Sequence, residues 1–284
     1  MSAWSKVRDF AVLTRIHNCL LAAASVMIGA FLADPSVTDK SLLGAAVVLF
    51  ISAGGYVLND IYDIGTDGIN KPWRPLPSGR VRKRSAAGLT ALSWGAGLML
   101  SVFAGPVAVD FAFGYMLLLW FYSFKLKSTG AAGTVLVSAV SSSGFVLGAA
   151  LGGNAAAGLL PFVIGFVFHF AREVVKGAVD VEGDRVAGIG TLPVRMGKRG
   201  SDVLCVASIA AVMALSIIPF AAGVYGLLYL VPVLAMQPLL ALCIYLIVAP
   251  GGEGRPEADS YGRVAGILKA VMPVGLLAFL LGGI

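Results

Sequence analysis

An acidic stretch at residues 59–67 holds the side chains of this sequence that are best suited to chemistry. It follows a long apolar run and places Asp60, Asp63 and Asp67 at the spacing i, i+3, i+7. On a helix, this spacing puts the three carboxylates along one face. Carboxylates at the end of a membrane-length apolar segment are costly to place there and usually serve a function.

A second acidic stretch, residues 180–184, follows another apolar run far downstream. Its Asp180 and Asp184 stand at i, i+4 and therefore share a helix face. Two acidic faces that approach one another repel unless cations lie between them, and Mg²⁺ prefers carboxylates, water and substrate phosphate oxygens as ligands. We therefore expect the two faces to lie opposite one another and to bind a diphosphate through Mg²⁺.

Basic side chains beside both stretches are suited to bind the remaining oxygens of such a diphosphate. Lys71 and Arg74 lie in a segment that the three prolines within 72–77 make rigid. Arg172 and Lys176 stand at i, i+4, on a face that continues into the second acidic stretch. These four cations are predicted to contact substrate.

Composition places the chain in a membrane. Of its 284 residues, 58% are hydrophobic and 13% are charged, whereas soluble domains carry about 25% charged residues. The mean hydropathy is +0.89. No low-complexity stretch divides the chain, so we expect a single domain over residues 1–284.

Long apolar runs predict transmembrane helices. We expect an all-α membrane protein whose nine transmembrane helices surround a central apolar cavity beneath cytoplasmic cap loops. The helices are expected at about 10–33, 41–62, 86–105, 107–124, 130–152, 157–178, 202–221, 225–248 and 262–283. The segments 185–199 and 250–263 are expected to be loops.

The distribution of basic residues predicts the orientation. Lys and Arg concentrate in the connections on one side of the predicted helices, whereas the alternate connections hold only Lys40. By the positive-inside rule, we expect a multi-pass protein of the cell membrane with its N-terminus and both acidic stretches in the cytoplasm. Loop charge accounts for the net charge of +6, so the basic balance does not indicate a nucleic-acid partner.

The first predicted helix carries polar residues near its start, among them Arg15, His17 and Asn18. Two interpretations remain open. The side chains could extend to the polar interface of the membrane, or Asn18 could point into the cavity and contact substrate.

A diphosphate at the mouth and a hydrocarbon chain in the cavity describe a polyprenyl diphosphate. Metal ions and cationic side chains stabilise a departing diphosphate. An allylic carbocation remains and must be kept from water until an acceptor attacks. The sequence therefore predicts prenyl transfer, with a carboxylate (Asp63 or Asp67) or the released diphosphate taking the acceptor's proton.

Three motifs carry a resemblance to a known family. With Asn59-Asp60-x-x-Asp63-x-x-x-Asp67, Arg74-Pro75-Leu76 and Asp180-x-x-x-Asp184, the chain resembles the UbiA superfamily of intramembrane prenyltransferases over nearly its full length. The resemblance implies Mg²⁺-dependent transfer from a prenyl diphosphate on a nine-helix fold. It implies that the metal and diphosphate are held, directly or through water, by Asn59, Asp60, Asp63, Asp180 and Asp184. Asp67, Arg74 and Lys176 would complete the polar mouth.

Residues 70–79 and 172–193 are similar to one branch of this superfamily, which acts in archaeal ether-lipid synthesis. That branch joins geranylgeranyl diphosphate to the free hydroxyl of geranylgeranylglyceryl phosphate, a lipid-like acceptor. The segment 122–127 fits the same branch, and the resemblance implies that Tyr122 and either Lys125 or Lys127 help bind substrate. Thr134 and Gly177 replace an asparagine and an acid that are common there.

Two other functions are consistent with parts of this pattern. An aromatic acceptor of a quinone or chlorophyll pathway would use the same acidic faces with a different acceptor pocket. A cation or metabolite transporter would also use carboxylates in the membrane, but transporters place such sites near the bilayer midplane in broken helices of paired repeats. Here the five aspartates stand at helix ends beside basic loops, which favours the enzyme.

Overall fold

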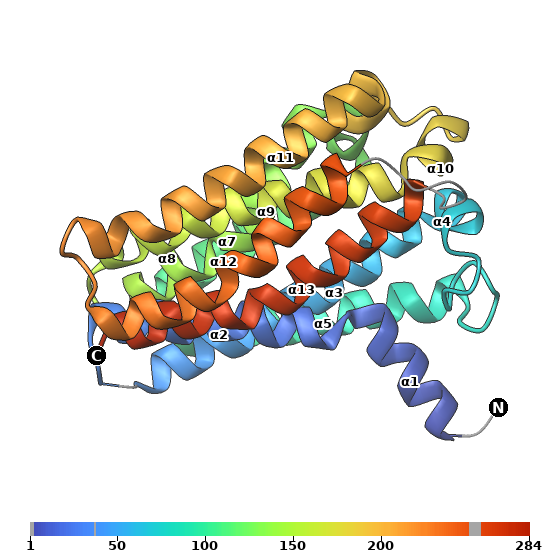
Figure 1. The fold of residues 1–284 in the computed structure, drawn as a ribbon. Coiled ribbons are helices and arrows are strands. Elements are labelled where there is room, and N and C mark those ends of the chain that lie inside the picture. Colours follow the sequence, from blue (N-terminus) through green and yellow to red (C-terminus); the bar gives the residue numbers. More distant parts are fainter. Residues whose placement is uncertain (1–2, 37, 250–256) are drawn as a thin grey trace.

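The computed structural model describes residues 3–36, 38–249 and 257–284, and every regular element in these ranges is a helix. Most helices run side by side along one direction (Figure 1). The short helices α4 (Ile64–Asn70) and α10 (Val181–Val186) lie at one end of this bundle, on the side of the N-terminus. We call it the polar end, and the opposite end, where the C-terminus lies, the far end.

Nine helical stretches of the described chain are long and apolar enough to cross a membrane, which confirms the predicted all-α membrane fold. Two of them consist of a pair of elements, namely α7 with α8 and the 3₁₀ helix η2 with α9. The elements are α2 (Ile16–Ala33), α3 (Asp39–Tyr62), α5 (Lys83–Ala104), α6 (Pro106–Phe124), α7 (Ala131–Ser142), α8 (Gly144–Leu151), η2 (Ala155–Gly158), α9 (Leu159–Val179), α11 (Leu192–Ala221), α12 (Leu227–Val248) and α13 (Glu257–Gly282). The helix α1 (Ala3–Thr14) precedes them, and the 3₁₀ helix η1 (Leu126–Thr129) follows α6.

The predicted helices 10–33 and 130–152 are each interrupted, and both acidic stretches are divided between two helices at an aspartate. Arg15, in the left-handed conformation with φ 48° and ψ 50°, separates α1 from α2. Asp63 ends α3 before α4, and Asp180 ends α9 before α10. The spacing predicted that each acidic stretch lies on one face of a single helix. This prediction is wrong, because each stretch is divided between two helices. Aspartate is unfavourable inside helices because its carboxylate competes for backbone hydrogen bonds.

Two predicted loops are partly helical. Helix α11 begins at Leu192, ten residues before the predicted start at 202, because Pro193 in its first turn is preorganised for a helix. Gly197, with φ 68°, kinks this helix. Likewise α13 begins at Glu257 within the predicted loop 250–263, of which residues 250–256 lie outside the described residues.

Glycines let α2 approach its neighbours closely. A Cβ atom on Gly29 or Gly148 would lie closer than 3.0 Å to a backbone carbonyl oxygen of the facing helix, that of Phe145 or Val26. Small residues allow such close approach of helix backbones in membranes. The packing fixes α2 beside α8 and holds one wall of the central cavity.

Candidate active site

The two acidic stretches meet in a pocket at the polar end. Its wall includes Asp63 and Asp67 from the first stretch and Asp180 and Asp184 from the second. The fifth aspartate, Asp60, is buried beside the pocket but does not line it. Residues about 120 positions apart in the sequence thus form one site.

Asn70, at the end of α4, ties the two acidic stretches together. Its side-chain amide donates to the carbonyl oxygen of Asp180 at 3.1 Å, and its Oδ1 accepts from the backbone N–H of Gly183 at 3.1 Å. Beside it, Nζ of Lys71 lies 2.5 Å from the carboxylate of Asp180. The sequence did not identify Asn70 as a residue of the site. Its position between the acidic stretch and Pro72 was the signal that could have identified it.

Arginines neutralise the carboxylates of α3 and α4. Arg15 donates to Oδ1 of Asp60 at 2.5 Å and lies over the ring of Tyr56, 4.8 Å from its centroid. Arg74 contacts Asp67 at 2.6 Å and Asp60 at 3.4 Å. The left-handed backbone at Arg15 is strained, and residues in such conformations cluster at functional sites. Sequence reasoning placed Arg15 near the start of a helix and missed this ion pair.

Lys127 joins the site, whereas Lys125 does not. Nζ of Lys127 lies 2.6 Å from Oδ2 of Asp63, which also accepts from the amide of Asn59 at 2.6 Å. Lys125 is exposed at the end of α6 and lines none of the three cavities described here. Tyr122 lines the pocket, and so do both departures from the ether-lipid branch, Thr134 and Gly177.

The remaining charged groups of the pocket are also held in place. Lys176 contacts Glu173 at 3.1 Å, and Asp184 accepts from the hydroxyl of Thr191 at 3.2 Å. Burial raises the pKa of Asp184, and the nearby Lys127 opposes this shift. Burial likewise lowers the pKa of Lys71 against the attraction of Asp180.

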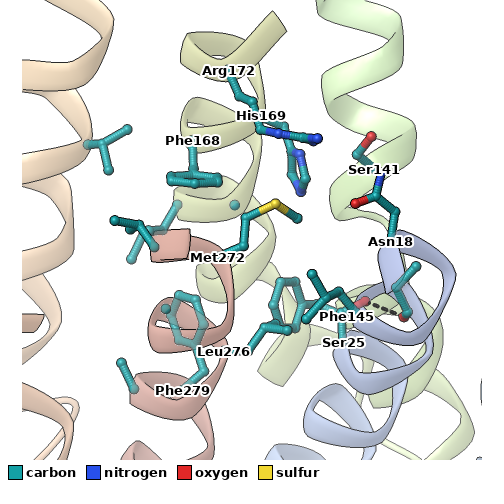
Figure 2. Close-up of a pocket in the computed structure, with 18 of the residues that line it drawn as sticks. Asn18, Ser25, Ser141, Phe145, Phe168, His169, Arg172, Met272, Leu276 and Phe279 are labelled. Carbon is teal, nitrogen blue, oxygen red and sulfur yellow. Dashed lines mark hydrogen bonds between the residues drawn. The ribbon is translucent and has the colours of Figure 1, made fainter. Parts of the chain in front are cut away.

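A large cavity lies between this site and the far end and holds about 920 Å³ of empty space, part of which is open to the surroundings. It is walled by α2, α3, α6 to α9 and α11 to α13. Asn18, Ser141, His169 and Arg172 lie near one end of it, and Phe279 lies toward the other (Figure 2).

The cavity is polar near one end and closed by aromatic rings at the other. Asn18 is buried with a relative exposure of 8%, and its Oδ1 has no hydrogen-bond partner among the described residues. At the far end, the ring of Phe279 packs edge-on against Phe145 at 5.4 Å and lies 5.9 Å from the ring of Tyr229.

A third cavity connects these two spaces. It shares Arg15, Asn59 and Lys176 with the polar pocket, and Asn18 and Arg172 with the large cavity. We call it the neck. Arg172 therefore lies on the neck and the large cavity, and not on the pocket that holds the aspartates. A charged group at the polar end and an apolar chain in the large cavity would form one continuous ligand.

The oxygen-rich pocket fits a Mg²⁺ ion that brings phosphate ligands with it. Within the described ranges, no group of three or more His, Cys, Asp or Glu side chains stands ready to hold a metal alone. The aspartates and Asn59 offer the oxygen donors that Mg²⁺ prefers, and this ion commonly keeps waters and substrate oxygens as further ligands. The lysines and arginines now paired with the aspartates suit the oxygens of a phosphate group.

In the described chain, nine membrane-length helices surround an apolar cavity with an aspartate-lined pocket at its mouth, which is the architecture expected of an intramembrane prenyltransferase. The model of the UbiA prenyltransferase family matches residues 22–258, a range that includes both acidic stretches, and the chain belongs to this family. Among curated relatives, it is 36% identical to digeranylgeranylglyceryl phosphate synthase of Hyperthermus butylicus, over 97% of each chain. The enzyme of the same name from Methanocaldococcus jannaschii is 32% identical, over 98% of this chain and 97% of the relative.

Solved structures agree with this assignment. A structure of digeranylgeranylglyceryl phosphate synthase superposes with a TM-score of 0.72 at 31% identity, over 98% of this chain and 99% of the other. A UbiA homologue from Aeropyrum pernix shares the fold with a TM-score of 0.73 at 21% identity, over 91% and 98%. A UbiA homologue from Archaeoglobus fulgidus bound to GPP and Mg²⁺ shares it with a TM-score of 0.66 at 16% identity, over 95% and 99%.

Proposed function

We propose that this protein transfers a geranylgeranyl group from geranylgeranyl diphosphate to the free hydroxyl of geranylgeranylglyceryl phosphate, in a Mg²⁺-dependent reaction that forms an ether-lipid precursor. The observation that carries the proposal is the meeting of two acidic stretches and their paired cations at the mouth of a long apolar cavity. The names of full-length relatives at 32–36% identity support this donor and acceptor.

The polar pocket is the proposed diphosphate site. Asn59, Asp60, Asp63, Asp180 and Asp184 would hold the metal and diphosphate, directly or through water. When bound, Mg²⁺ would neutralise the diphosphate and stabilise it as a leaving group. Lys71, Arg74 and Lys127 are paired with Asp180, Asp60 and Asp63. They would therefore be placed to bind phosphate oxygens when Mg²⁺ is bound to the carboxylates.

The cavity walls and the carboxylates have separate roles in the reaction. The C1–O bond of the donor breaks, and its electron pair leaves with the diphosphate. The apolar walls keep water from the allylic cation. The acceptor's hydroxyl oxygen then forms the ether bond to C1, and its proton passes to Asp63, to Asp67 or to the released diphosphate. Both aspartates line the pocket in which the leaving group would lie.

The proposed function also includes the domain organisation, the orientation in the membrane and the membrane-lipid nature of the acceptor. Residues 1–284 would form a single domain, with the polar end in the cytoplasm, where the basic connections favour its placement. The acceptor is a membrane lipid, which the apolar cavity suits.

A transfer assay tests this function directly. Purified protein in detergent receives Mg²⁺ and labelled geranylgeranyl diphosphate, with geranylgeranylglyceryl phosphate in one sample and 4-hydroxybenzoate in another. We expect label to enter the glycerol phosphate lipid and the reaction to stop when EDTA is added. Label entering only the aromatic compound would overturn the acceptor, and intact donor in both samples would overturn prenyl transfer.

A further inference from the structure

Three cationic or protonatable side chains converge beside the large cavity. They are His17 on α2, Arg172 on α9 and Lys269 on α13, and α13 packs against both α2 and α9. The proposed diphosphate chemistry above requires neither His17 nor Lys269. Their convergence within the membrane-spanning helices therefore calls for a separate explanation.

The register of α2 and α13 places His17 and Lys269 at one level. The two helices run in the same direction, from the polar end to the far end, and touch near the far end, where a Cβ atom on Gly283 would lie 2.8 Å from the ring of Phe31. His17 stands fourteen residues before Phe31, and Lys269 stands fourteen residues before Gly283. Fourteen residues span about 21 Å along an α-helix. They therefore face the same layer of the bundle, close to its polar end.

Helix periodicity places both side chains next to the cavity. Lys269 precedes the cavity-lining Met272 by three residues, and His17 precedes the cavity-lining Leu21 by four. Such pairs share a helix face. Arg172 lines the cavity itself (Figure 2). Arg172 also lines the neck, whereas His17 and Lys269 are exposed and line none of the three cavities, so these two groups lie on the exposed side of the cavity's polar edge.

The acidic residue that adjoins this cluster, Glu173, is already paired with Lys176. None of the three residues forms an ion pair within the described ranges. Lys269 is exposed, so extension of its amine to the membrane interface is the structural alternative. Convergence of two cations is unfavourable without an anion, and charged residues at membrane depth mark ligand sites.

Asn18 provides an independent sign of a ligand at this place. It follows His17 in α2, it lines both the neck and the cavity, and it is buried to more than nine-tenths. Its Oδ1 has no partner in the described structure, although a buried carbonyl oxygen without a hydrogen bond is costly. A hydroxyl group of a ligand would satisfy it.

We propose that His17, Arg172 and Lys269 form a subsite for the phosphate monoester of the lipid acceptor, with Asn18 accepting a hydrogen bond from the hydroxyl that attacks the donor. This assignment rests on the proposed function. Phosphate and free hydroxyl stand on the same three-carbon glycerol backbone, and the cations and Asn18 offer neighbouring partners for both. The neck then directs the hydroxyl toward the pocket that holds the diphosphate.

Steady-state kinetics with two acceptors test the subsite. We compare wild-type protein with Lys269→Gln and His17→Gln, using geranylgeranylglyceryl phosphate and its phosphate-free counterpart geranylgeranylglycerol. In Lys269→Gln we expect KM for the phosphorylated acceptor to rise at least about ten-fold, which corresponds to about 1.4 kcal/mol. KM for the donor should not change, the preference for the phosphorylated acceptor should shrink, and Lys269→Arg should restore it.

Matched controls separate this role from general effects of charge. Lys83→Gln removes an exposed lysine at the start of α5, away from the cavities, and should leave both KM values unchanged. The subsite is wrong if Lys269→Gln leaves the acceptor KM within about two-fold of wild type, or alters both acceptors equally. It is also wrong if Lys269→Gln changes only the response to added anionic phospholipid, because the cluster then binds bulk lipid. Failure of wild-type protein to use the phosphorylated acceptor would overturn the proposed function and the subsite with it.

Discussion

The contact between Asn70 and Gly183 yields a sharp prediction about how the two acidic stretches cooperate. A Cβ atom on Gly183 would lie closer than 3.0 Å to the side-chain amide of Asn70. Gly183→Ala must therefore displace Asn70 and break its bonds to the carbonyl of Asp180 and to the N–H of residue 183. Two neutral hydrogen bonds contribute about 2 kcal/mol in total. Their loss would lower the equilibrium constant for the arrangement in which Asn70 joins the two stretches by roughly thirty-fold.

Kinetics at varied Mg²⁺ and donor concentrations measure this effect. We expect Gly183→Ala to raise the donor KM and the half-saturating Mg²⁺ concentration by about ten-fold or more, with the thermal unfolding temperature close to that of wild type. Gly68→Ala, at an open position in α4, is the matched control and should leave both quantities unchanged. Unaltered donor and Mg²⁺ dependence in Gly183→Ala would refute the idea that Asn70 holds the stretches together.

Two further predictions concern the walls of the cavity. Gly148→Ala should lower the unfolding temperature, because its Cβ would press on the carbonyl oxygen of Val26. The control Gly114→Ala, at an open position, should leave the unfolding temperature unchanged. Equal unfolding temperatures for the two variants would contradict the packing described for α2 and α8. Phe279→Ala removes the ring that packs on Phe145 at the far end, so kcat/KM for a donor one isoprene unit longer, relative to geranylgeranyl diphosphate, should rise about ten-fold or more. An unchanged ratio in folded protein would show that another group limits chain length.

Hydropathy and residue spacing predicted the helices and the region of the site. Apolar runs of membrane length strongly indicate helices, because backbone N–H and C=O groups in lipid must find their hydrogen-bond partners within the helix. The spacing of Asp60, Asp63 and Asp67, together with the second acidic stretch, indicated two groups that approach one another. The structure brings Asp63, Asp67, Asp180 and Asp184 to one pocket.

The details that the sequence did not reveal depend on tertiary contacts. The left-handed turn at Arg15 lacks a glycine or proline signal, and it is stabilised by the distant Asp60. Lys125 and Lys127 differ little as sequence positions, yet the short 3₁₀ helix after α6 directs only Lys127 to Asp63. Asn70 acquires its role only when α10 packs beside α4.

The central claim is that the two acidic stretches act as one site for Mg²⁺ and diphosphate. The most direct test measures Mg²⁺-dependent transfer from geranylgeranyl diphosphate by Asp63→Asn, Asp180→Asn and the double variant. We predict that each single variant loses activity by about a hundred-fold or more, and that the double variant is scarcely worse, because residues that act as a unit are not additive. Normal Mg²⁺-dependent turnover in either single variant would contradict the account.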